Sequence, residues 1–327
     1  MQMHTIVVTV AMSEAKRAML ESILGEEVRL SFLANTPSNL REQTLSAATV
    51  LFSWLLPKEL GSNEFSLLKN VQMIQLLSAG ANHVPFTKLP LSIIVAGNVG
   101  AYAEPMAEHI LAMTLALAKN LLKEHQKLAQ GVFNQSTLNR LLRGSVCGII
   151  GFGGIGRATA RLMRGLGMRI YAVNTSGKTD ESVDFIGTMN DLQHVLSSSE
   201  VVVITIPLTK ATRHCIGKRE LEWMKSDAIL INVARGDIIA EEALYTHLLN
   251  HPDFKAGIDA WWIEPLHTGE FRTEYPFFSL PNVLGSPHNS TLVPGHRDEA
   301  IKRAAENISR FLNGVPVSGV VRRDDYI

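Results

Sequence analysis

Short apolar runs alternate with amphipathic stretches along most of this chain of 327 residues. A first series of runs covers residues 6–10, 28–33, 49–53 and 71–76, and a second covers residues 146–150, 169–173, 201–206, 229–232, 256–258 and 283–284. Such runs, separated by helical patterns, are typical of β-α-β units, in which a helix connects two parallel strands. The two series therefore predict two α/β domains, each built on a parallel sheet.

The sequence also predicts helices and the kind of connection that joins the two domains. Ser13 is expected to cap a helix that ends near residue 24, and residues 297–313 form a helix expected to pack onto one of the two domains. Residues 103–120 are apolar on almost every side, which predicts a helix covered by a neighbouring domain or subunit. Because no Gly/Ser-rich or Pro-rich linker separates the domains, we expect structured connections and a cleft that can enclose a ligand.

Charge and hydropathy exclude several classes of protein. The 31 Lys and Arg residues balance 31 Asp and Glu residues, so the excess of positive charge expected for a partner of nucleic acid or of an anionic membrane is missing. The longest apolar stretch, residues 109–122, is interrupted by Lys119 and Asn120 and is shorter than the roughly 20 residues that cross a bilayer. We expect no nucleic-acid partner and no membrane span.

The cysteines and the first residues indicate a cytoplasmic protein. Cys147 and Cys215 are too few for a disulfide framework, and no Cys-x-x-Cys motif is present. Residues 1–10 lack the basic start, long apolar stretch and small-residue cleavage site of a secretory signal.

A glycine-rich turn is the most informative local motif. Gly151-x-Gly153-x-x-Gly156 follows an apolar run and opens a helical stretch. Glycines at such a turn can be purely structural, but the run before, the helix after and a second run ending at residue 173 all favour a dinucleotide-binding turn, with the pyrophosphate at the helix N-terminus. The expected cofactor contacts at this turn are Gly151, Gly153, Gly154, Ile155, Gly156 and Arg157.

The residues after the second run bear on the choice of nucleotide. An Asp or Glu there would bind the ribose 2′-hydroxyl and repel a 2′-phosphate, but this chain has Asn174, Thr175, Ser176, Gly177 and Lys178. Two hydroxyls and one positive charge favour a phosphate, so we expect NADP in preference to NAD. The alternative is that Asn174 accepts the ribose hydroxyl and NAD is used.

Arginines recur at helical spacing after the turn. Arg157 is close enough in sequence to reach the pyrophosphate, whereas Arg161 and Arg164 are expected to form a solvated face. They do not indicate a nucleic-acid site.

Ionisable residues follow three of the later apolar runs, where open α/β sheets bind their ligands. They are Arg235 in Asn-Val-Ala-Arg-Gly, Glu264 in Trp-Trp-Ile-Glu-Pro and His288 in Ser-Pro-His-Asn. In this order, Arg then Glu then His, the chain resembles the D-isomer-specific 2-hydroxyacid dehydrogenases. The resemblance also includes Ala79-Gly80, Ala107-Glu108-His109, Gly151–Gly156, Pro207-Leu208-Thr209 with Thr212, Arg235-Gly236, Glu264-Pro265 and Pro287-His288.

The resemblance implies a fold and an assembly. It implies two Rossmann-like domains with doubly wound parallel sheets. The cofactor domain, residues 100–289, would be inserted into a split, flavodoxin-like substrate domain formed by residues 1–99 and 290–327. It also implies a homodimer to which the helix around residues 106–120 contributes. Further cofactor contacts are expected at Ile206, Pro207, Thr212, Val233, Ala234, Asp259 and His288, with Asp259 bonded to the nicotinamide carboxamide.

Chemistry assigns roles to the three ionisable residues. Reduction of a 2-oxo acid needs a proton donor near neutral pH, which favours His288 as the acid/base. Glu264 is the carboxylate expected to favour the protonated imidazole and to fix its tautomer. Arg235 offers planar, permanently charged donors for the substrate carboxylate and carbonyl. The backbone N–H groups of Ala79 and Gly80 would complete the carboxylate site.

For other residues, a structural role explains the sequence as well as a functional role does, or better. Trp54 lines the substrate pocket or belongs to the core or a surface patch. His247 and His251 have metal-ligand spacing, but Pro252 and the lack of a third ligand favour a helix end. No metal site and no P-loop are expected.

These features predict an NAD(P)H-dependent reductase of small 2-oxo acids such as glyoxylate or hydroxypyruvate. Formate dehydrogenases are disfavoured because they resemble one another in having Gln at the position of Glu264. A phosphoglycerate dehydrogenase-like enzyme without a regulatory domain and a co-repressor-like, cofactor-sensing binding protein remain alternatives. The physiological substrate stays open because pocket shape depends on side chains that the fold brings together.

Overall fold

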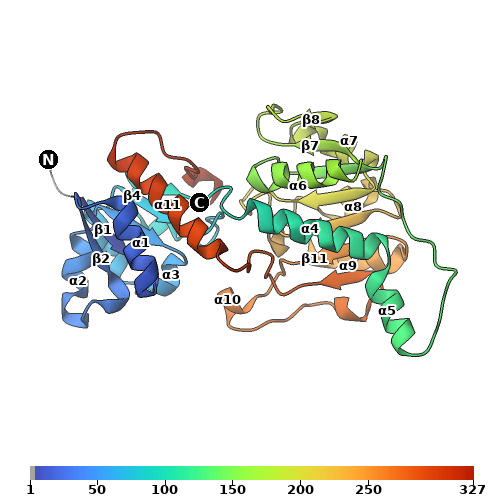
Figure 1. The fold of residues 1–327 in the computed structure, drawn as a ribbon, viewed down its shortest axis with the longest axis horizontal. Helices are drawn as coiled ribbons and strands as arrows, with labels where there is room; N and C mark the ends of the chain where they lie inside the picture. Colours follow the sequence, from blue (N-terminus) through green and yellow to red (C-terminus); the bar gives the residue numbers. More distant parts are fainter. Residues whose placement is uncertain (1–3) are drawn as a thin grey trace. The chain divides into compact units, whose positions relative to one another are not determined.

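The computed structural model describes residues 4–327, so residues 1–3, which belong to the expectation about a secretory signal, lie outside it. The chain divides into two compact units: Met1–Tyr102 with Val293–Ile327, and Ala103–Leu292. Each unit is built on its own parallel sheet, which confirms the α/β prediction (Figure 1).

The first unit has a five-stranded sheet in the order β2-β1-β3-β4-β5, the order of flavodoxin-like folds. Its strands are β1 (His4–Val8), β2 (Val28–Phe32), β3 (Val50–Ser53), β4 (Met73–Leu76) and β5 (Ile94–Ala96). Its helices are α1 (Glu14–Leu24), α2 (Ser38–Ser46), α3 (Leu56–Glu59) and α11 (His296–Leu312). Figure 1 shows α11, from the far end of the chain, beside α1, and it also packs on β4.

Both faces of this sheet are buried, which explains the continuous apolar runs. Val7, Leu51 and Ile74 enter one core cluster, whereas Ile6 and Val8 enter another that Ile301 of α11 completes. Strand β5 escaped sequence analysis because it is only three residues long. Ser13 lies at the N-cap of α1, but its side chain makes no capping hydrogen bond.

The second unit has a seven-stranded sheet in the order β12-β11-β10-β9-β6-β7-β8. Counted from β6, this is the doubly wound dinucleotide-binding order with one strand added at the edge. Its strands are β6 (Val146–Ile150), β7 (Arg169–Val173), β8 (Phe185–Gly187), β9 (Val201–Ile204), β10 (Ile229–Asn232), β11 (Lys255–Ile258) and β12 (Val283–Gly285). Its helices are α4 (Ala103–Ala118), α5 (Leu121–Ala129), α6 (Gly154–Gly165), α7 (Leu192–Ser198), α8 (Lys218–Trp223), α9 (Glu241–Asn250) and α10 (Pro265–Thr268).

Helix α4 is covered in part by its own unit. Its buried residues include Met106, Ala107, Ile110 and Met113, and the helix packs against α6 and against β10 and β11. Cover of its remaining face by a second subunit stays a prediction.

The segment after α4 is the exception to close packing. Helix α5 has no buried residue, and in Figure 1 α5 and the following loop project from the rest of their unit. Their exposed apolar side chains are Leu121, Leu122, Leu128, Val132, Phe133, Leu138 and Leu141, with Phe133 76% and Leu138 91% exposed. We call residues 121–141 the apolar arm. Separately, none of the described helices has the length and hydropathy needed to span a membrane.

Candidate active site

The glycine-rich turn has the backbone geometry that a bound pyrophosphate requires. Gly151 has φ +102°, and a Cβ on it would lie 2.8 Å from Ile206. A Cβ on Gly156 would lie 2.2 Å from the carbonyl oxygen of Gly151, so helix α6 approaches the turn too closely for any side chain. A Cβ on Gly153 would meet open space. The turn between β6 and α6 therefore fits a dinucleotide phosphate.

The other predicted residues of this turn occupy varied positions. Gly154 and Ile155 form the first turn of α6. Arg157, expected at the pyrophosphate, forms an ion pair with Asp180 at 2.5 Å, and its contact with a cofactor stays a prediction.

The two following arginines are about half exposed, and both are paired. Arg161 pairs with Glu104 at 2.8 Å and Glu181 at 3.2 Å, and Arg164 lies 3.6 Å from Asp184. The arginine face therefore connects α6 to α4 and to the loop that follows β7.

Asn174 organises the loop after β7. Its Oδ1 accepts hydrogen bonds from the backbone N–H groups of Ser176 at 3.0 Å and Gly177 at 2.7 Å, and its Nδ2 donates to the carbonyl oxygen of Lys178 at 2.8 Å. These bonds occupy the amide, so the structure favours Asn174 as a turn former. Thr175, Ser176 and Lys178 are exposed around it.

The loop after β9 is closed by Thr212. Its hydroxyl donates to the carbonyl oxygen of Pro207 at 2.6 Å and accepts from the N–H of Thr209 at 2.8 Å. Ile206, at the start of the loop, packs on Gly151. Ile206 and Pro207 thus lie beside the glycine turn, whereas the hydroxyl of Thr212 is used within its own loop.

The segment after β10 carries Arg235. The side chain of Asn232 accepts from the N–H of Ala234 at 3.1 Å and donates to the carbonyl oxygen of Arg235 at 2.9 Å. A Cβ on Gly236 would lie 2.4 Å from the backbone of Trp261, which brings this segment against the loop after β11. Val233 and Ala234 are buried, and the Arg235 Nη1 donates to the Ala234 carbonyl oxygen at 2.7 Å.

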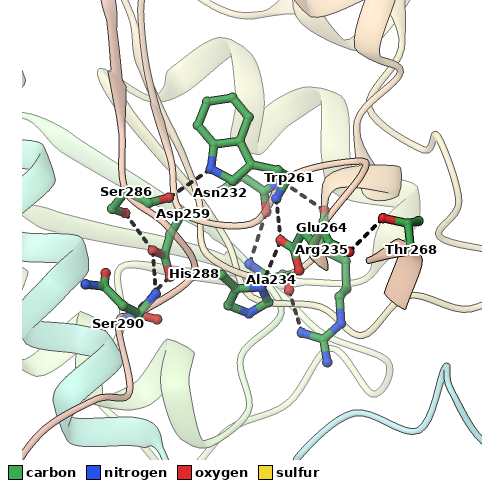
Figure 2. Close-up of polar contacts among 11 residues, drawn as sticks. Asn232, Ala234, Arg235, Asp259, Trp261, Glu264, Thr268, Ser286, His288 and Ser290 are labelled. Atoms are coloured by element: carbon green, nitrogen blue, oxygen red, sulfur yellow. Dashed lines mark hydrogen bonds and ion pairs between the residues drawn. The ribbon is translucent and has the colours of Figure 1, made fainter. Parts of the chain in front are cut away.

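Glu264 and His288 form a hydrogen-bonded ion pair, drawn in Figure 2. The Nδ1 of His288 lies 2.9 Å and 2.8 Å from the two carboxylate oxygens of Glu264. One of these oxygens also accepts from the backbone N–H of Trp261 at 2.7 Å. The Glu264 side chain is 11% exposed and that of His288 is 32% exposed. The pair leaves the second ring nitrogen, Nε2, for another partner.

The environment keeps Glu264 ionised. Burial raises the pKa of its carboxyl, but the hydrogen bond and charge of His288, the N–H of Trp261 and the charge of Arg235 outweigh burial, so the pKa is lowered. A carboxylate that stays charged favours a positive partner. The two hydrogen-bond contacts with the charged carboxylate fix the orientation of the imidazole ring.

A second network supports the loop that carries His288. The buried carboxylate of Asp259 accepts from the hydroxyl of Ser286 at 2.6 Å and from the N–H groups of Asn289 at 3.2 Å and Ser290 at 3.4 Å. His109 of α4 lies 2.9 Å from the Ser286 hydroxyl and 3.6 Å from Asp259. Sequence analysis assigned Asp259 to the nicotinamide and missed Ser286 and the role of His109.

This network has a local consequence for the backbone. His288 has φ +50°, a conformation that a non-glycine residue rarely adopts. The bonds from Asp259 to the residues on either side of Pro287 and His288 hold the strained loop in place. The Asp259 contact to a cofactor stays a prediction.

The predicted substrate residues of the first unit lie at the carboxyl-terminal edge of its own sheet. Trp54 follows β3 and is 37% exposed. Ala79 and Gly80 follow β4, and their backbone N–H groups have no acceptor among residues 4–327. Open donors at such an edge suit an anionic group.

Side chains that could bind a metal ion do not form a cluster in the described part of the chain. No group of three or more His, Cys, Asp or Glu side chains there could hold a metal ion. His247 and His251 stack on each other with ring centres 4.1 Å apart, and His251 caps the end of α9.

Comparisons with known proteins identify the family of the chain. A family model described as D-isomer specific 2-hydroxyacid dehydrogenase, NAD binding domain, matches residues 111–290. Glyoxylate reductase from Thermococcus gammatolerans is 39% identical over 171 residues, which cover 52% of this chain and 49% of that protein, about half its length. Hydroxypyruvate reductase from Thermotoga maritima is 32% identical over 223 residues, 67% of this chain and 71% of that protein.

A solved structure extends the likeness of fold to nearly the whole chain. The D-isomer specific 2-hydroxyacid dehydrogenase from Xanthobacter autotrophicus Py2, in complex with NADPH and MES, has a TM-score of 0.81 and 21% identity, and the match covers 99% of this chain and 100% of that one. Family model, relatives and glycine turn lead to one conclusion. The chain belongs to the D-isomer-specific 2-hydroxyacid dehydrogenase family.

Proposed function

We propose that this protein is a D-2-hydroxyacid dehydrogenase that uses NAD(P)H to reduce small 2-oxo acids such as glyoxylate or hydroxypyruvate. Membership of a family of NAD(P)-dependent oxidoreductases supports the reaction class. The observation that carries the proposal is the Glu264–His288 pair, 2.8 Å apart, at the carboxyl-terminal edge of a dinucleotide-binding sheet. An imidazole oriented by a carboxylate in this way can act as a general acid.

The residues of the glycine turn fit a dinucleotide and would hold it. A bound NAD(P)H supplies the hydride for carbon 2 of the substrate. NADP is preferred in this proposal because the 174–178 loop presents Ser176, Thr175 and Lys178 and no carboxylate. Residues 100–289 would form the cofactor domain, and residues 1–99 with 290–327 the substrate domain.

His288 supplies the proton in this mechanism. Its Nε2 faces away from Glu264 and donates to the carbonyl oxygen of the substrate, which becomes the hydroxyl of the product; in the reverse reaction it accepts that proton. Glu264 orients the ring and stabilises its positive charge. Arg235 binds and polarises the substrate through charged N–H donors.

The substrate carboxylate would be bound by the N–H groups of Ala79 and Gly80, whose donors have no acceptor among the described residues. Two or more aligned N–H groups stabilise an anion without a full countercharge.

We also propose a cytoplasmic homodimer. The apolar arm is exposed and large, and exposed apolar patches of this kind mark interaction surfaces. Both cysteines are free, as is usual for proteins of a reducing compartment. Light scattering of the purified protein tests the dimer, and Leu138→Ser with Phe133→Ser should produce monomers.

A substrate panel tests the function. Purified protein should oxidise NADPH, and more slowly NADH, in the presence of glyoxylate or hydroxypyruvate and yield the D-product where the product is chiral. Tight cofactor binding without turnover on any 2-oxo acid would instead support a cofactor-sensing binding protein. Oxidation restricted to phosphoglycerate would support the phosphoglycerate dehydrogenase alternative.

A further inference from the structure

An arginine and a tryptophan stack at the substrate edge of the first unit. The guanidinium carbon of Arg297 lies 4.9 Å from the centre of the Trp54 ring. Arg297 is the second residue of α11, whereas Trp54 directly follows β3. The fold thus brings two distant parts of the sequence together at an exposed position where open α/β sheets bind ligands.

A closed chain of contacts fixes this pair beside the end of β4. The N–H of Leu77 donates to the carbonyl oxygen of Ser53 at 2.7 Å, next to Trp54. The Tyr102 hydroxyl donates to the carbonyl oxygen of Leu77 at 2.7 Å, and the Tyr102 ring packs on His296 with ring centres 5.6 Å apart. His296 precedes Arg297, so the contacts return to the stacked pair.

The backbone under Trp54 is held rigidly by Glu59. Its carboxylate accepts from the N–H of Trp54 at 3.1 Å, the N–H of Leu55 at 2.8 Å and the hydroxyl of Ser53 at 2.6 Å. Three bonds to consecutive residues fix the direction in which the chain leaves β3. The backbone that carries the Trp54 indole is therefore fixed, and the guanidinium of Arg297 stacks on this ring.

Arg297 has no carboxylate partner within the described part of the chain. Its neighbour Asp298 pairs with Lys16 at 3.2 Å instead. An arginine stacked on an aromatic face keeps the N–H donors on its edge available for an anion. In addition, the buried Nε2 of His296 has no hydrogen-bond partner. The carboxyl-terminal edge of the first sheet therefore has hydrogen-bonding groups without a partner among the described residues.

These donors differ in kind from the backbone N–H groups of Ala79 and Gly80, which also lie beyond β4 and also have no acceptor among residues 4–327. The backbone groups suit the carboxylate that every 2-oxo acid carries. A separate guanidinium suits a second oxygen-bearing group.

Building on the proposed function, we propose that Arg297, stacked on Trp54, is a specificity-determining residue that binds an oxygen-bearing group beyond carbon 2 of the substrate. The preferred substrates are then 2-oxo acids with a hydroxyl or a second carboxylate on carbon 3 or beyond. Glyoxylate, which ends at carbon 2, makes no use of Arg297.

The test compares substrates in Arg297→Met, with Lys302→Met as the control that removes a positive charge from an exposed position of the same helix. Loss of a charge-assisted hydrogen bond should lower kcat/KM for hydroxypyruvate and 2-oxosuccinate by about 10- to 100-fold. Glyoxylate reduction should keep its wild-type value. Equal losses on all three substrates, or no loss on any, would overturn the inference.

Binding gives a readout that does not depend on turnover. Malonate, a dicarboxylate without a reactive carbonyl, should raise the Tm of the wild-type protein and of Lys302→Met but not that of Arg297→Met, whereas acetate should act equally on all three. Equal stabilisation of all three by malonate contradicts the inference. Absence of reduction of any 2-oxo acid by the wild-type protein overturns the proposed function, which separates the two failures.

Discussion

The carboxyl-terminal edges of the two sheets carry polar groups in different states. In the second unit, Glu264 and His288 are bonded to each other, and Asp259 is bonded to Ser286 and to the backbone around it. In the first unit, the N–H groups of Ala79 and Gly80 have no acceptor within the described residues, and Arg297 has a stacking partner but no countercharge.

The proposed function explains this difference. A group that transfers a proton needs one orientation and one protonation state before the substrate arrives, so its hydrogen bonds are made within the protein. Groups that bind an anion need donors that are open until the anion arrives. Changes at the second unit's edge should therefore reduce kcat, whereas changes at the first unit's edge should raise KM.

The largest effect is expected for His288→Gln, which removes the proposed proton donor but keeps a polar side chain. Turnover of 2-oxo acids should fall by roughly 10²–10⁴-fold, the usual contribution of a general acid. Cofactor affinity, measured by quenching of protein fluorescence, should stay close to that of the wild-type protein. A variant with normal kcat would remove His288 from the mechanism.

The next effect is expected for Glu264→Gln, which removes the negative charge but keeps the hydrogen-bonding shape. Because the lowered pKa of Glu264 keeps the wild-type carboxylate charged at neutral pH, its loss disfavours the imidazolium there. The alkaline limb of the reduction profile should move to lower pH, with a loss of about 10-fold at pH 7. The reverse oxidation, which needs neutral imidazole, should instead persist to lower pH.

A smaller, KM-type effect is expected for Trp54→Leu. Loss of the stacking platform under Arg297 should raise KM for hydroxypyruvate by about 3- to 10-fold, the range of a cation–π contact, with little change in kcat. Trp223→Leu is the matched control, since Trp223 also lies under an arginine, with Arg219 at 5.0 Å, but on α8. Equal effects of the two variants would contradict the difference between the edges.

The smallest effect concerns stability and involves neither edge. Burial, helped by the charge of His251, lowers the pKa of His247 from 6.5 to about 4. Between pH 6.5 and pH 4 the unfolded chain binds a proton at His247 that the folded protein does not bind. The free energy of unfolding is therefore unaffected by protonation of His247 above pH 6.5 and decreases as pH falls toward 4.

His247→Phe should therefore show a smaller fall in Tm between pH 7 and pH 5 than the wild-type protein, and scanning calorimetry measures it. The exposed His125 is the control position, where His125→Gln should leave the pH dependence of Tm unchanged. Identical slopes for the wild-type protein and His247→Phe would refute this explanation.

Local sequence pattern was sufficient for the parts of the fold that depend on near neighbours. The apolar runs predicted most strands because both faces of each sheet are buried. The short strands β5 and β8, three residues each, carry too little pattern to be recognised. The burial of α4 was correctly predicted, but not that α6, β10 and β11 supply part of its cover, because an apolar helix has the same sequence pattern whatever covers it.

The candidate site shows the same limit. The sequence motif indicated Asp259, but not that its oxygens are used by Ser286, Asn289 and Ser290. It placed Arg157 near a pyrophosphate, whereas its ion pair with Asp180 appears only once the loop after β7 folds back on α6. A residue type indicates what it can bind, and its neighbours in space decide what it does bind.

The sequence by itself determined two parallel α/β modules, the glycine turn and the three ionisable residues after separate strands, because each depends on spacing along one stretch of chain. The contact of Glu264 with His288 was expected from the sequence and is present in the structure, but only the tertiary structure decided that His109 meets Ser286 and that Trp54 meets Arg297. The physical reason is that hydrogen bonds and ring stacking act over a few ångströms, and only the packing of sheets and helices brings such separated side chains within that range.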